Sequence, residues 1–468
     1  MNRRGFLEGF AAALVARGTA IADQAASPGG NADFTLRIAP VEVELSPRRK
    51  IKTTGYNGSV PGPVLRMTEG KPVTIEVHND TEVPELVHWH GLWIPPEVDG
   101  AMEEGTPMVP PRQARRYQFV PRPGGTRWYH SHIYAGRNLR RSTYTGQFGF
   151  LLIESAQEPG RYDQEFQLAL HGWDPYLSSM SGGGDGSLEV AYNAFSINSH
   201  ALGAGDPLRV KQGQRVRFRL LNASASSFHR LALPGHQFLV TALDGNPVPS
   251  PKAVPMLEMG PGERIDAVVE MNRPGVWILG DTDEATRKAG LGVVVEYAGR
   301  SGPPVWEPAP DELWDYTTFG RAPDAREPVP EPDARVPLVF RAKFAGNRWV
   351  DHWTINGKEY PKTDPIRVRT NRRYRLVFDN QSDDMHPVHL HRHSFELVHV
   401  AGKPTAGVLK DVVAVPPRKQ VEVEFTANNP GPSLFHCHMQ LHMDFGFMTL
   451  VQYEDQPLSG QAHQGELP

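Results

Sequence analysis

The chain has 468 residues, a length that suggests roughly three domains. It carries 49 Lys and Arg against 53 Asp and Glu, and this near-balance, without a long basic block, excludes nucleic acid and anionic membrane surfaces as expected partners. The 45 Gly and 43 Pro residues indicate many turns and few long helices, which favours an all-β fold.

The first 22 residues, "MNRRGFLEGFAAALVARGTAIA", resemble a twin-arginine export signal. They contain paired arginines, a Phe-Leu pair, a short apolar run and a small-residue site that ends at Ala22. Arg17 interrupts the apolar run, and a membrane span needs about 20 apolar residues, so no transmembrane helix is predicted. We expect export of the folded protein by the twin-arginine route to the periplasm or the medium. The alternative is a disordered N-terminal tail.

A weak repeat divides the rest of the chain. It appears as "YNGSVPGPVLRMTEGKPVTIEVHN" ending at Asn79, "INSHALGAGDPLRVKQGQRVRFRLLN" ending at Asn222 and "INGKEYPKTDPIRVRTNRRYRLVFDN" ending at Asn380. These asparagines are separated by domain-sized intervals, not by the short period of a solenoid. Alternating runs such as "VTIEV" and "RVRFRL" predict half-buried strands. We therefore expect three β-sandwich-like domains.

The repeat and the segment ends give the expected domain limits. Domain one is predicted at 34–156, domain two at 160–300 and domain three at 335–456. Residues 301–334 are rich in Pro and acidic residues, which predicts an extended linker over the surface. The run "SGGGDGS" at 181–187 predicts a flexible loop within domain two.

Domains one and three each contain two His-x-His motifs. Domain one has "HWHG" and "HSH", domain three has "HPVHLHRH" and "HCH", and domain two has no such pair at the matching places. Side chains at i and i+2 lie on one face of a strand, so four such strands can turn eight imidazoles toward one site. Eight imidazoles exceed the needs of one four-coordinate zinc, which predicts a multinuclear metal cluster. The eight residues are His88, His90, His130, His132, His389, His391, His436 and His438.

Five further histidines lack a pairing pattern and are predicted to be structural, and His393 is expected beside the cluster. The structural set is His171, His229, His236, His352 and His399.

Cys437 is the only cysteine in the chain and lies between His436 and His438. Because neighbours on a strand face opposite sides, its thiol is expected to point away from the cluster, into domain three. His386 and His442 can join it there, and a thiolate with two imidazoles is the ligand set of a blue-copper electron-transfer site. The alternative is burial of Cys437 as a small apolar residue.

The motifs "HWHG", "HSH", "HPVHLH" and "HCHMQLH", in this order, resemble those of the multicopper oxidases over essentially the whole mature chain. The resemblance implies three cupredoxin-like Greek-key β-sandwich domains and four copper ions. By motif position it implies type 1 copper at His386, Cys437 and His442, and type 2 copper at His88 and His389. It implies the type 3 pair at His90, His130, His132, His391, His436 and His438.

The resemblance also implies a laccase-like reaction with catalytic roles for Cys437, His442 and Asp99. A small-molecule reductant gives single electrons to type 1 copper through the exposed edge of His442, and they pass along Cys437 to the cluster, which reduces dioxygen to two waters. Asp99 resembles the family acid beside the oxygen and water channel; the alternative is a turn former. Bacterial relatives often carry a second acid directly after the last type 1 histidine. Here that residue is Met443, and Asp444 is a hypothesis for the role.

Three functions stay open at this point. The first is oxidation of phenols and aromatic amines. The second is a cuprous oxidase, for which soft thioether ligands would select Cu(I), but the 12 Met residues form no long Met-rich segment. The third is a non-catalytic copper-binding scaffold, which would not need the full ligand set. Asp383 and Asp384, just before His386, are candidates to bind a phenol proton or an amine, or to cap a loop.

The residue over type 1 copper is expected five positions beyond the last type 1 histidine, at Phe447 in "HMDFGFMTLV". A weak axial Met tunes the potential of many blue-copper sites, whereas Phe has no donor atom. We therefore predict a relatively high potential. In the alternative, Phe447 packs the core and Met448 supplies an axial sulfur.

Overall fold

The computed structural model describes residues 30–155, 161–179, 188–310, 312–322, 331–343 and 350–456. The predicted export signal at 1–22 and the loop at 181–187 lie outside these ranges. Strands dominate the described chain, and its three α-helices have four or five residues each. The all-β prediction is confirmed. Among the described residues, no helix has the length and apolar character needed to span a membrane.

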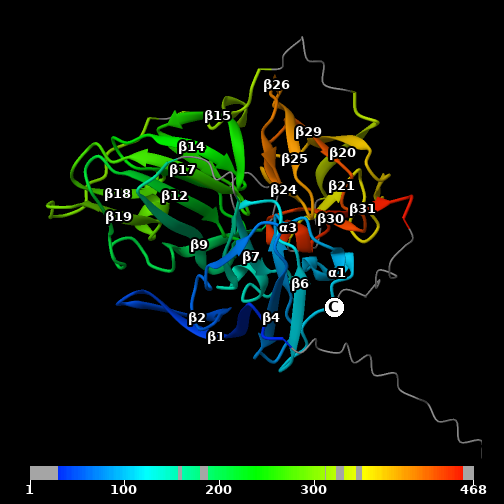
Figure 1. Ribbon diagram of the computed structural model, residues 1–468, viewed down its shortest axis with the longest axis horizontal. Coiled ribbons are helices and arrows are strands. Elements are labelled where there is room, and N and C mark those ends of the chain that lie inside the picture. Colours follow the sequence, from blue (N-terminus) through cyan, green and yellow to red (C-terminus); the bar gives the residue numbers. More distant parts are fainter. Residues whose placement is uncertain are drawn as a thin grey trace, which may run out of the picture. The chain divides into compact units, whose positions relative to one another are not determined.

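Domain one contains two sheets (Figure 1). Its strands are β1 (Phe34–Ser46), β2 (Arg49–Tyr56), β3 (Leu65–Thr68), β4 (Val73–Asn79), β5 (Val87–His90), β6 (Ala114–Phe119), β7 (Gly125–Ser131) and β8 (Phe148–Glu154), with α1 (Pro96–Asp99), η1 (Met102–Glu104) and η2 (Ser142–Tyr144) between them. The strand orders are β2-β1-β4-β6 and β3-β8-β7-β5. Side chains from both sheets, including Leu36 and Tyr129, share one buried core, so the sheets pack as a sandwich. Burial alternates along β4, as "VTIEV" predicts.

Domain two repeats the two-sheet plan. Its elements are β9 (Gln164–Ser178), β10 (Glu189–Ile197), β11 (Leu208–Val210), β12 (Arg215–Asn222), β13 (His229–Ala232), β14 (Phe238–Leu243), β15 (Asn246–Val254), β16 (Met256–Met259), β17 (Arg264–Glu270), β18 (Val276–Asp281), α2 (Glu284–Lys288) and β19 (Gly292–Tyr297). The strand orders are β10-β9-β12-β17-β14-β15 and β11-β19-β18-β13-β16.

The prediction that "RVRFRL" is a half-buried strand is wrong, because β12 is buried on both faces. Arg217 and Arg219 are 1% and 3% exposed. The carboxylate of Asp266 lies 2.8 Å from Arg217 and 3.3 Å from Arg219. Burial of a charge is tolerated when the charge is paired and hydrogen-bonded, so the alternating arginines do not mark a solvent face.

Domain three has the same plan again. Its elements are β20 (Ala334–Lys343), β21 (His352–Ile355), β22 (Ile366–Val368), β23 (Arg373–Asn380), β24 (His386–Leu390), β25 (Phe395–Val400), β26 (Lys403–Pro404), β27 (Leu409–Lys410), β28 (Val412–Val415), β29 (Gln420–Thr426), β30 (Ser433–Cys437), α3 (Gln440–Asp444) and β31 (Met448–Tyr453). One sheet has the order β21-β20-β23-β29-β25-β26, with β27 paired to β25, and the other has β22-β31-β30-β24-β28. The domain limits given by the sequence stay a prediction.

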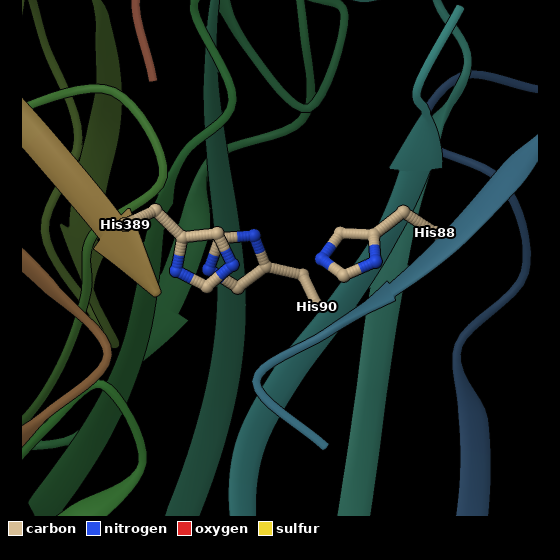
Figure 2. A group of neighbouring side chains, drawn as sticks. All are labelled: His88, His90 and His389. Atoms are coloured by element: carbon tan, nitrogen blue, oxygen red, sulfur yellow. The ribbon is translucent and has the colours of Figure 1, made fainter. Parts of the chain in front are cut away.

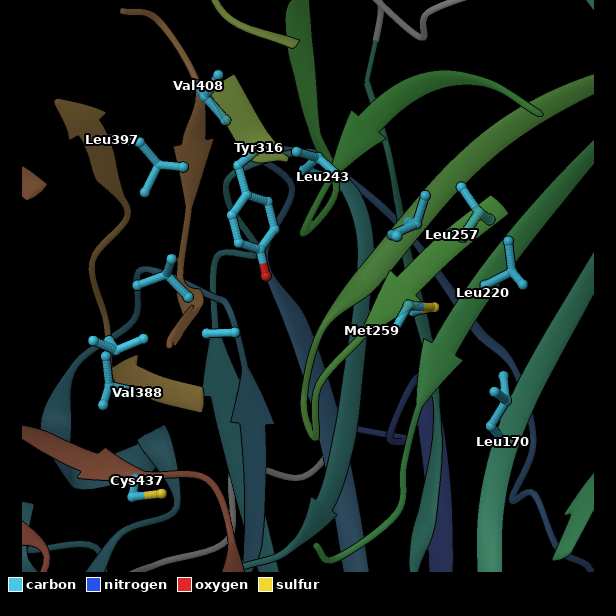
Figure 3. Packing of buried hydrophobic residues seen from close by; sticks show 14 of the residues in the cluster. Leu170, Leu220, Leu243, Leu257, Met259, Tyr316, Val388, Leu397, Val408 and Cys437 are labelled. Carbon is cyan, nitrogen blue, oxygen red and sulfur yellow. The ribbon is translucent and has the colours of Figure 1, made fainter. Parts of the chain in front are cut away.

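The sequence predicts that the linker between domains two and three runs over the surface, but part of this linker is buried. It forms η3 (Tyr316–Phe319), in which Tyr316 and Phe319 are 5% and 1% exposed. Tyr316 donates a hydrogen bond of 2.6 Å to Glu263 Oε1. Figure 3 shows its ring between residues of domain two, such as Leu243, and residues of domain three, such as Val408. The aromatic residues of "LWDYTTF" therefore determine the burial of this segment, despite the Pro-rich and acidic composition around it, because burial of aromatic side chains is favourable.

Candidate metal centres

Within each of domains one and three, the two His-x-His motifs begin on strands that pair with each other. β5 pairs with β7, with His88 opposite His130, and β24 pairs with β30, with His389 opposite His436. His90 also lies on β5, whereas His132, His391 and His438 lie one residue beyond the ends of β7, β24 and β30. Figure 2 shows the rings of His88, His90 and His389 turned toward one another.

The eight paired histidines fall into three groups, in each of which the candidate ligand atoms lie within 4.8 Å of one another. Ring centroids are 3.8 Å apart for His90 and His389 and 4.0 Å apart for His88 and His391, and both pairs are stacked. The structure therefore brings all eight residues together. The groups are His88, His90 and His389; His90, His130 and His438; and His132, His391 and His436.

Several of these rings are fixed by the protein on one side and free on the other. Nδ1 of His88, His130 and His389 donates to backbone carbonyls at 2.9, 2.9 and 2.7 Å. In these three rings Nε2 is buried and has no hydrogen-bond partner among the described residues. A buried polar atom without a partner costs free energy, and a metal ion would accept its lone pair. The residues present therefore fit a resident metal cluster.

Burial and neighbouring imidazoles lower the pKa of seven of the eight cluster histidines well below the usual value. A metal ligand must be deprotonated to bind, and a neutral imidazole meets that requirement at neutral pH. The seven are His90, His130, His132, His389, His391, His436 and His438.

A second group lies within domain three, around the cysteine. Cys437 Sγ lies 3.6 Å from His442 Nδ1 and 3.8 Å from His386 Nδ1, and the two nitrogens are 3.2 Å apart. All three side chains are fully buried. The Trp353 ring covers both imidazoles, with centroid distances of 4.5 Å to His386 and 4.2 Å to His442. One sulfur and two nitrogens can thus hold one metal ion.

Phe447 and Met448 face opposite sides of the chain. The Phe447 ring is fully buried, lies 4.9 Å from the His386 ring and belongs to the same apolar cluster as Cys437. Met448 packs in a separate cluster with Leu434. Phe447, which lacks a donor atom, is therefore the one of the two that borders the thiol group.

The side chain of His442 is fully buried, so the expectation of an exposed edge is wrong. The outer nitrogen of His442 faces domain two. Its Nε2 lies 3.3 Å from Glu189 Oε1 at the start of β10, and Glu189 Oε2 is buried without a hydrogen-bond partner in the described chain. Burial opposes a proton on His442, but the Glu189 carboxylate and the Cys437 sulfur outweigh it and raise the pKa of His442 to about 10. Glu189 was not predicted, because no motif marks it.

The two aspartates before His386 have different surroundings. Asp383 is exposed and pairs with Arg418 through both carboxylate oxygens, at 2.8 and 2.9 Å. This pair accounts for Asp383 without a substrate. Asp384 is partly buried, and burial raises the pKa of its carboxyl.

Two buried acids border the cluster. Asp99 Oδ2 lies 2.9 Å from His391 Nδ1 and 3.1 Å from His88 Nδ1, while its Oδ1 has no hydrogen-bond partner in the described part of the chain. Glu104 Oε1 lies 3.4 Å from His391 Nδ1 and accepts a hydrogen bond of 2.6 Å from the Leu434 amide. Burial, followed by the Asp99 carboxylate, raises the pKa of Glu104 well above its usual value. Glu104 was missed, although "DGAMEEG" places it five residues after Asp99.

Asp444 has a different set of partners. Its Oδ2 accepts from the Ala135 and Gly136 amides at 3.1 and 2.8 Å, and its Oδ1 accepts from Gln440 at 2.9 Å. The carboxylate thus fastens α3, which carries His442, to a loop of domain one.

Five of the six histidines outside these metal groups make hydrogen bonds of their own, and the sixth, His399, lies near a carboxylate. His171 bonds a backbone carbonyl at 2.8 Å, His229 bonds Asp281 at 3.0 Å, and His393 Nε2 bonds the Tyr453 hydroxyl at 2.9 Å. His236 and His352 bond the Tyr297 hydroxyl and Glu359 at 2.6 and 2.7 Å, and His399 lies 3.5 Å from Glu422.

Comparison with known proteins agrees with this geometry. Three profiles described as multicopper oxidase match residues 37–158, 178–295 and 331–457. Multicopper oxidase MmcO of Mycobacterium tuberculosis is 33% identical, over 97% of this chain and 96% of that protein. A copper resistance protein A homolog of Pseudomonas syringae pv. tomato is 23% identical, over 97% of this chain and 99% of that protein. The crystal structure of Fet3p, a multicopper oxidase that functions in iron import, superposes with a TM-score of 0.76 at 18% identity, over 93% of this chain and 92% of that chain.

Proposed function

Because the chain belongs to the multicopper oxidase family and is therefore a copper-dependent oxidoreductase, we propose that it couples one-electron oxidation of phenols or aromatic amines to four-electron reduction of dioxygen to water. The observation that carries the proposal is the position of Cys437. Its sulfur belongs to one candidate metal group, while its two sequence neighbours belong to the other groups.

We propose four resident copper ions. Type 1 copper would be held by His386, Cys437 and His442, and type 2 copper by His88 and His389. The free Nε2 atoms of His88 and His389 support the second assignment. The type 3 pair would be held by His90, His130 and His438 on one side and by His132, His391 and His436 on the other. When bound, these ions supply one-electron transfer at the type 1 site and reduction of dioxygen at the cluster.

The protein's own residues connect and isolate the two sites. The backbone of His436, Cys437 and His438 joins them covalently. Trp353 and Phe447 pack apolar rings against the buried type 1 ligands, and the lack of a donor atom in Phe447 supports a relatively high potential. Asp99, whose Oδ1 is buried and free of partners in the described residues, would hold a proton beside His88 and His391.

The surroundings of His442 support a reductant that carries a transferable proton or a positive charge. Glu189 Oε1 lies 3.3 Å from the outer nitrogen of His442. A carboxylate at this point can accept the proton that a phenol or an aromatic amine loses on oxidation. Asp384 adds a second, partly buried carboxyl group, whose pKa burial raises.

Oxidation of Cu(I) is the second candidate. The carboxylate beside His442 could attract a metal cation as well as an amine, and one relative is named for copper resistance. However, the described methionines do not form one group. Met259 is buried in the main core, whereas Met443 and Met448 are buried in a separate cluster.

We also propose that residues 1–22 direct export by the twin-arginine route to the periplasm. Replacement of Arg3 and Arg4 by Lys should leave the folded protein in the cytoplasm. The experiment is fractionation of cells that express the parent and the variant, and equal export of both would contradict the route.

Oxygen uptake separates the substrate hypotheses. The purified, copper-loaded protein is compared with a substituted phenol and with Cu(I) as alternative reductants. The proposal requires uptake with the phenol and loss of that uptake in His442→Ala. A strong preference for Cu(I) would favour the second candidate, and no uptake with either reductant would favour a scaffold without turnover.

A further inference from the structure

Asp411 orients two histidines of the cluster. Its Oδ1 accepts a hydrogen bond of 3.0 Å from His90 Nε2, and its backbone carbonyl accepts one of 2.7 Å from His389 Nδ1. His90 is thereby turned the other way from His88, His130 and His389. Its Nε2 faces the protein, whereas its buried Nδ1 has no hydrogen-bond partner among the described residues. The Asp411 carboxylate therefore decides which nitrogen His90 offers to the cluster.

Arg264 holds this carboxylate from domain two. Its Nη1 lies 2.7 Å from Asp411 Oδ1 and its Nη2 lies 2.6 Å from Oδ2. This two-pronged contact fixes the plane of the carboxylate as well as its position. The other guanidinium bonds go to the carbonyls of Gly262, Asp244 and Thr126, at 2.9, 3.1 and 3.4 Å. All five N–H groups of the guanidinium then donate hydrogen bonds, so the Arg264 guanidinium cannot rotate without loss of a buried hydrogen bond.

The contact lies where all three domains meet. Arg127, on β7 of domain one, lies 3.3 Å from Asp411 Oδ2, and the three side chains of Arg127, Arg264 and Asp411 are fully buried. Gly91 follows His90, and a Cβ at Gly91 would lie 2.8 Å from both Arg264 Nη2 and Asp411 Oδ2. The backbone of Gly91, next to His90, is thus packed directly against the contact between Arg264 and Asp411.

We propose that Arg264 is a positioning residue for the copper cluster and acts through Asp411 on His90 and His389. Domain two, which supplies none of the candidate ligands, would in this way take part in building the cluster. The inference rests on the proposed function, because it requires copper in the cluster. It predicts that Lys cannot replace Arg264, since an ammonium group keeps the charge but cannot bind both carboxylate oxygens in one plane.

Arg264→Lys tests the proposal in the copper-loaded full chain. Copper per protein, the visible absorption of the thiolate-bound copper and the electron paramagnetic resonance signal of the cluster copper are measured during competition with a copper chelator. Loss of a residue that orients a metal ligand typically weakens metal binding about 10- to 100-fold, and we expect that loss for the cluster copper alone. The visible band should persist, because Arg264 contacts none of His386, Cys437 and His442.

Arg217→Lys is the matched control. Arg217 is also buried in domain two and binds a carboxylate, that of Asp266 at 2.8 Å, so its variant should leave both copper signals unchanged. Unchanged cluster copper in Arg264→Lys would overturn the proposal, and so would parallel loss of both signals, which would indicate a role in the whole fold. If Arg264→Lys does not accumulate, Asp411→Asn is judged by the same criterion. Absence of cluster copper from the parent protein would instead overturn the proposed function.

Discussion

At the scale of single residues, Cys437 offers a ligand atom that no side chain of similar size replaces. The hydroxyl of Ser is a poor copper ligand, although the two side chains have nearly the same volume. We expect Cys437→Ser to lose the intense visible absorption and the oxidation of substrates. The melting temperature of the copper-free protein should stay near that of the parent, because a buried side chain is replaced by one of similar shape.

The measurements are an absorption spectrum, oxygen uptake and a thermal melt. Ser131→Ala, at the matching place in domain one, is the control and should keep the band. A variant at Cys437 that remained intensely coloured would contradict the type 1 assignment.

Phe447 gives a second prediction at this scale. Its ring borders His386 at 4.9 Å, and replacement by Met would bring a thioether toward type 1 copper. An added axial donor, compared with none, stabilises the more highly charged oxidised ion, so Phe447→Met should lower the reduction potential of the copper that gives the visible band, as measured by redox titration. Met448→Leu should change it little, because Met448 packs in another cluster. The opposite pattern, with the larger shift for Met448→Leu, would show that Met448 is the axial residue.

The buried carboxyl group of Glu85 should make the stability of the protein depend on pH. Burial raises the pKa of its carboxyl to about 7, despite a hydrogen bond of 2.9 Å from Gln147. A folded-state pKa above the unfolded value means that stability is full below about pH 4.5 and falls as pH rises through 7, by on the order of 3 kcal/mol. Glu85→Gln removes this dependence. Its copper-free protein should lose less melting temperature than the parent between pH 5 and pH 8, and a parallel loss would refute the assignment. Exposed Glu97→Gln is the control.

At the scale of elements, the Asp444 carboxylate is one of the contacts that hold α3 against domain one. Asp444 accepts two backbone amides of domain one and the Gln440 side chain. In Asp444→Ala these buried donors lose their acceptor, at a cost of about 1–3 kcal/mol for each donor. We expect a lower melting temperature and a disturbed type 1 spectrum, because α3 carries His442.

Asp444→Asn keeps an acceptor oxygen and should be milder. Because the Asp444 carboxylate is engaged by two backbone amides and the Gln440 side chain, the pH profile of oxygen uptake in Asp444→Asn should match the parent's. A changed profile would revive the hypothesis that Asp444 supplies protons.

The sequence predicts features that depend on neighbouring residues, but it does not predict contacts between distant parts of the chain. The facing of His436, Cys437 and His438 follows from strand alternation, which acts between adjacent residues and is visible in the sequence. Glu189 and Arg264 reach the metal groups only because domain two folds against domain three, and no spacing in the sequence records that contact. β12 and η3 were misjudged for a related reason: a buried partner for an arginine, or an apolar surface for Tyr316, comes from a distant part of the chain.

At the scale of the whole molecule, the cluster joins domains one and three. Copper that binds only the folded chain stabilises it, by about 4.1 kcal/mol when free copper is 1,000 times the dissociation constant. Removal of copper by a chelator should therefore lower the melting temperature of the parent. Cys437→Ser should keep most of this copper-dependent difference, since its cluster ligands are intact, whereas His88→Ala should lose part of it. Equal melting temperatures of the copper-loaded and copper-free parent would contradict a metal bridge between the domains.

The division of the hydrophobic core bears on the order of events during synthesis. The largest core of domain one is built from its own strands β1 to β8, whereas the main core of domain two is continuous with that of domain three through Tyr316. On the ribosome the N-terminal domain can complete its main core early. The part of the domain two core that packs on domain three can form only when the last third of the chain has emerged, because domains fold as their segments emerge. The two halves of the histidine cluster then meet only near the end of translation, so a prematurely terminated chain lacks the complete cluster.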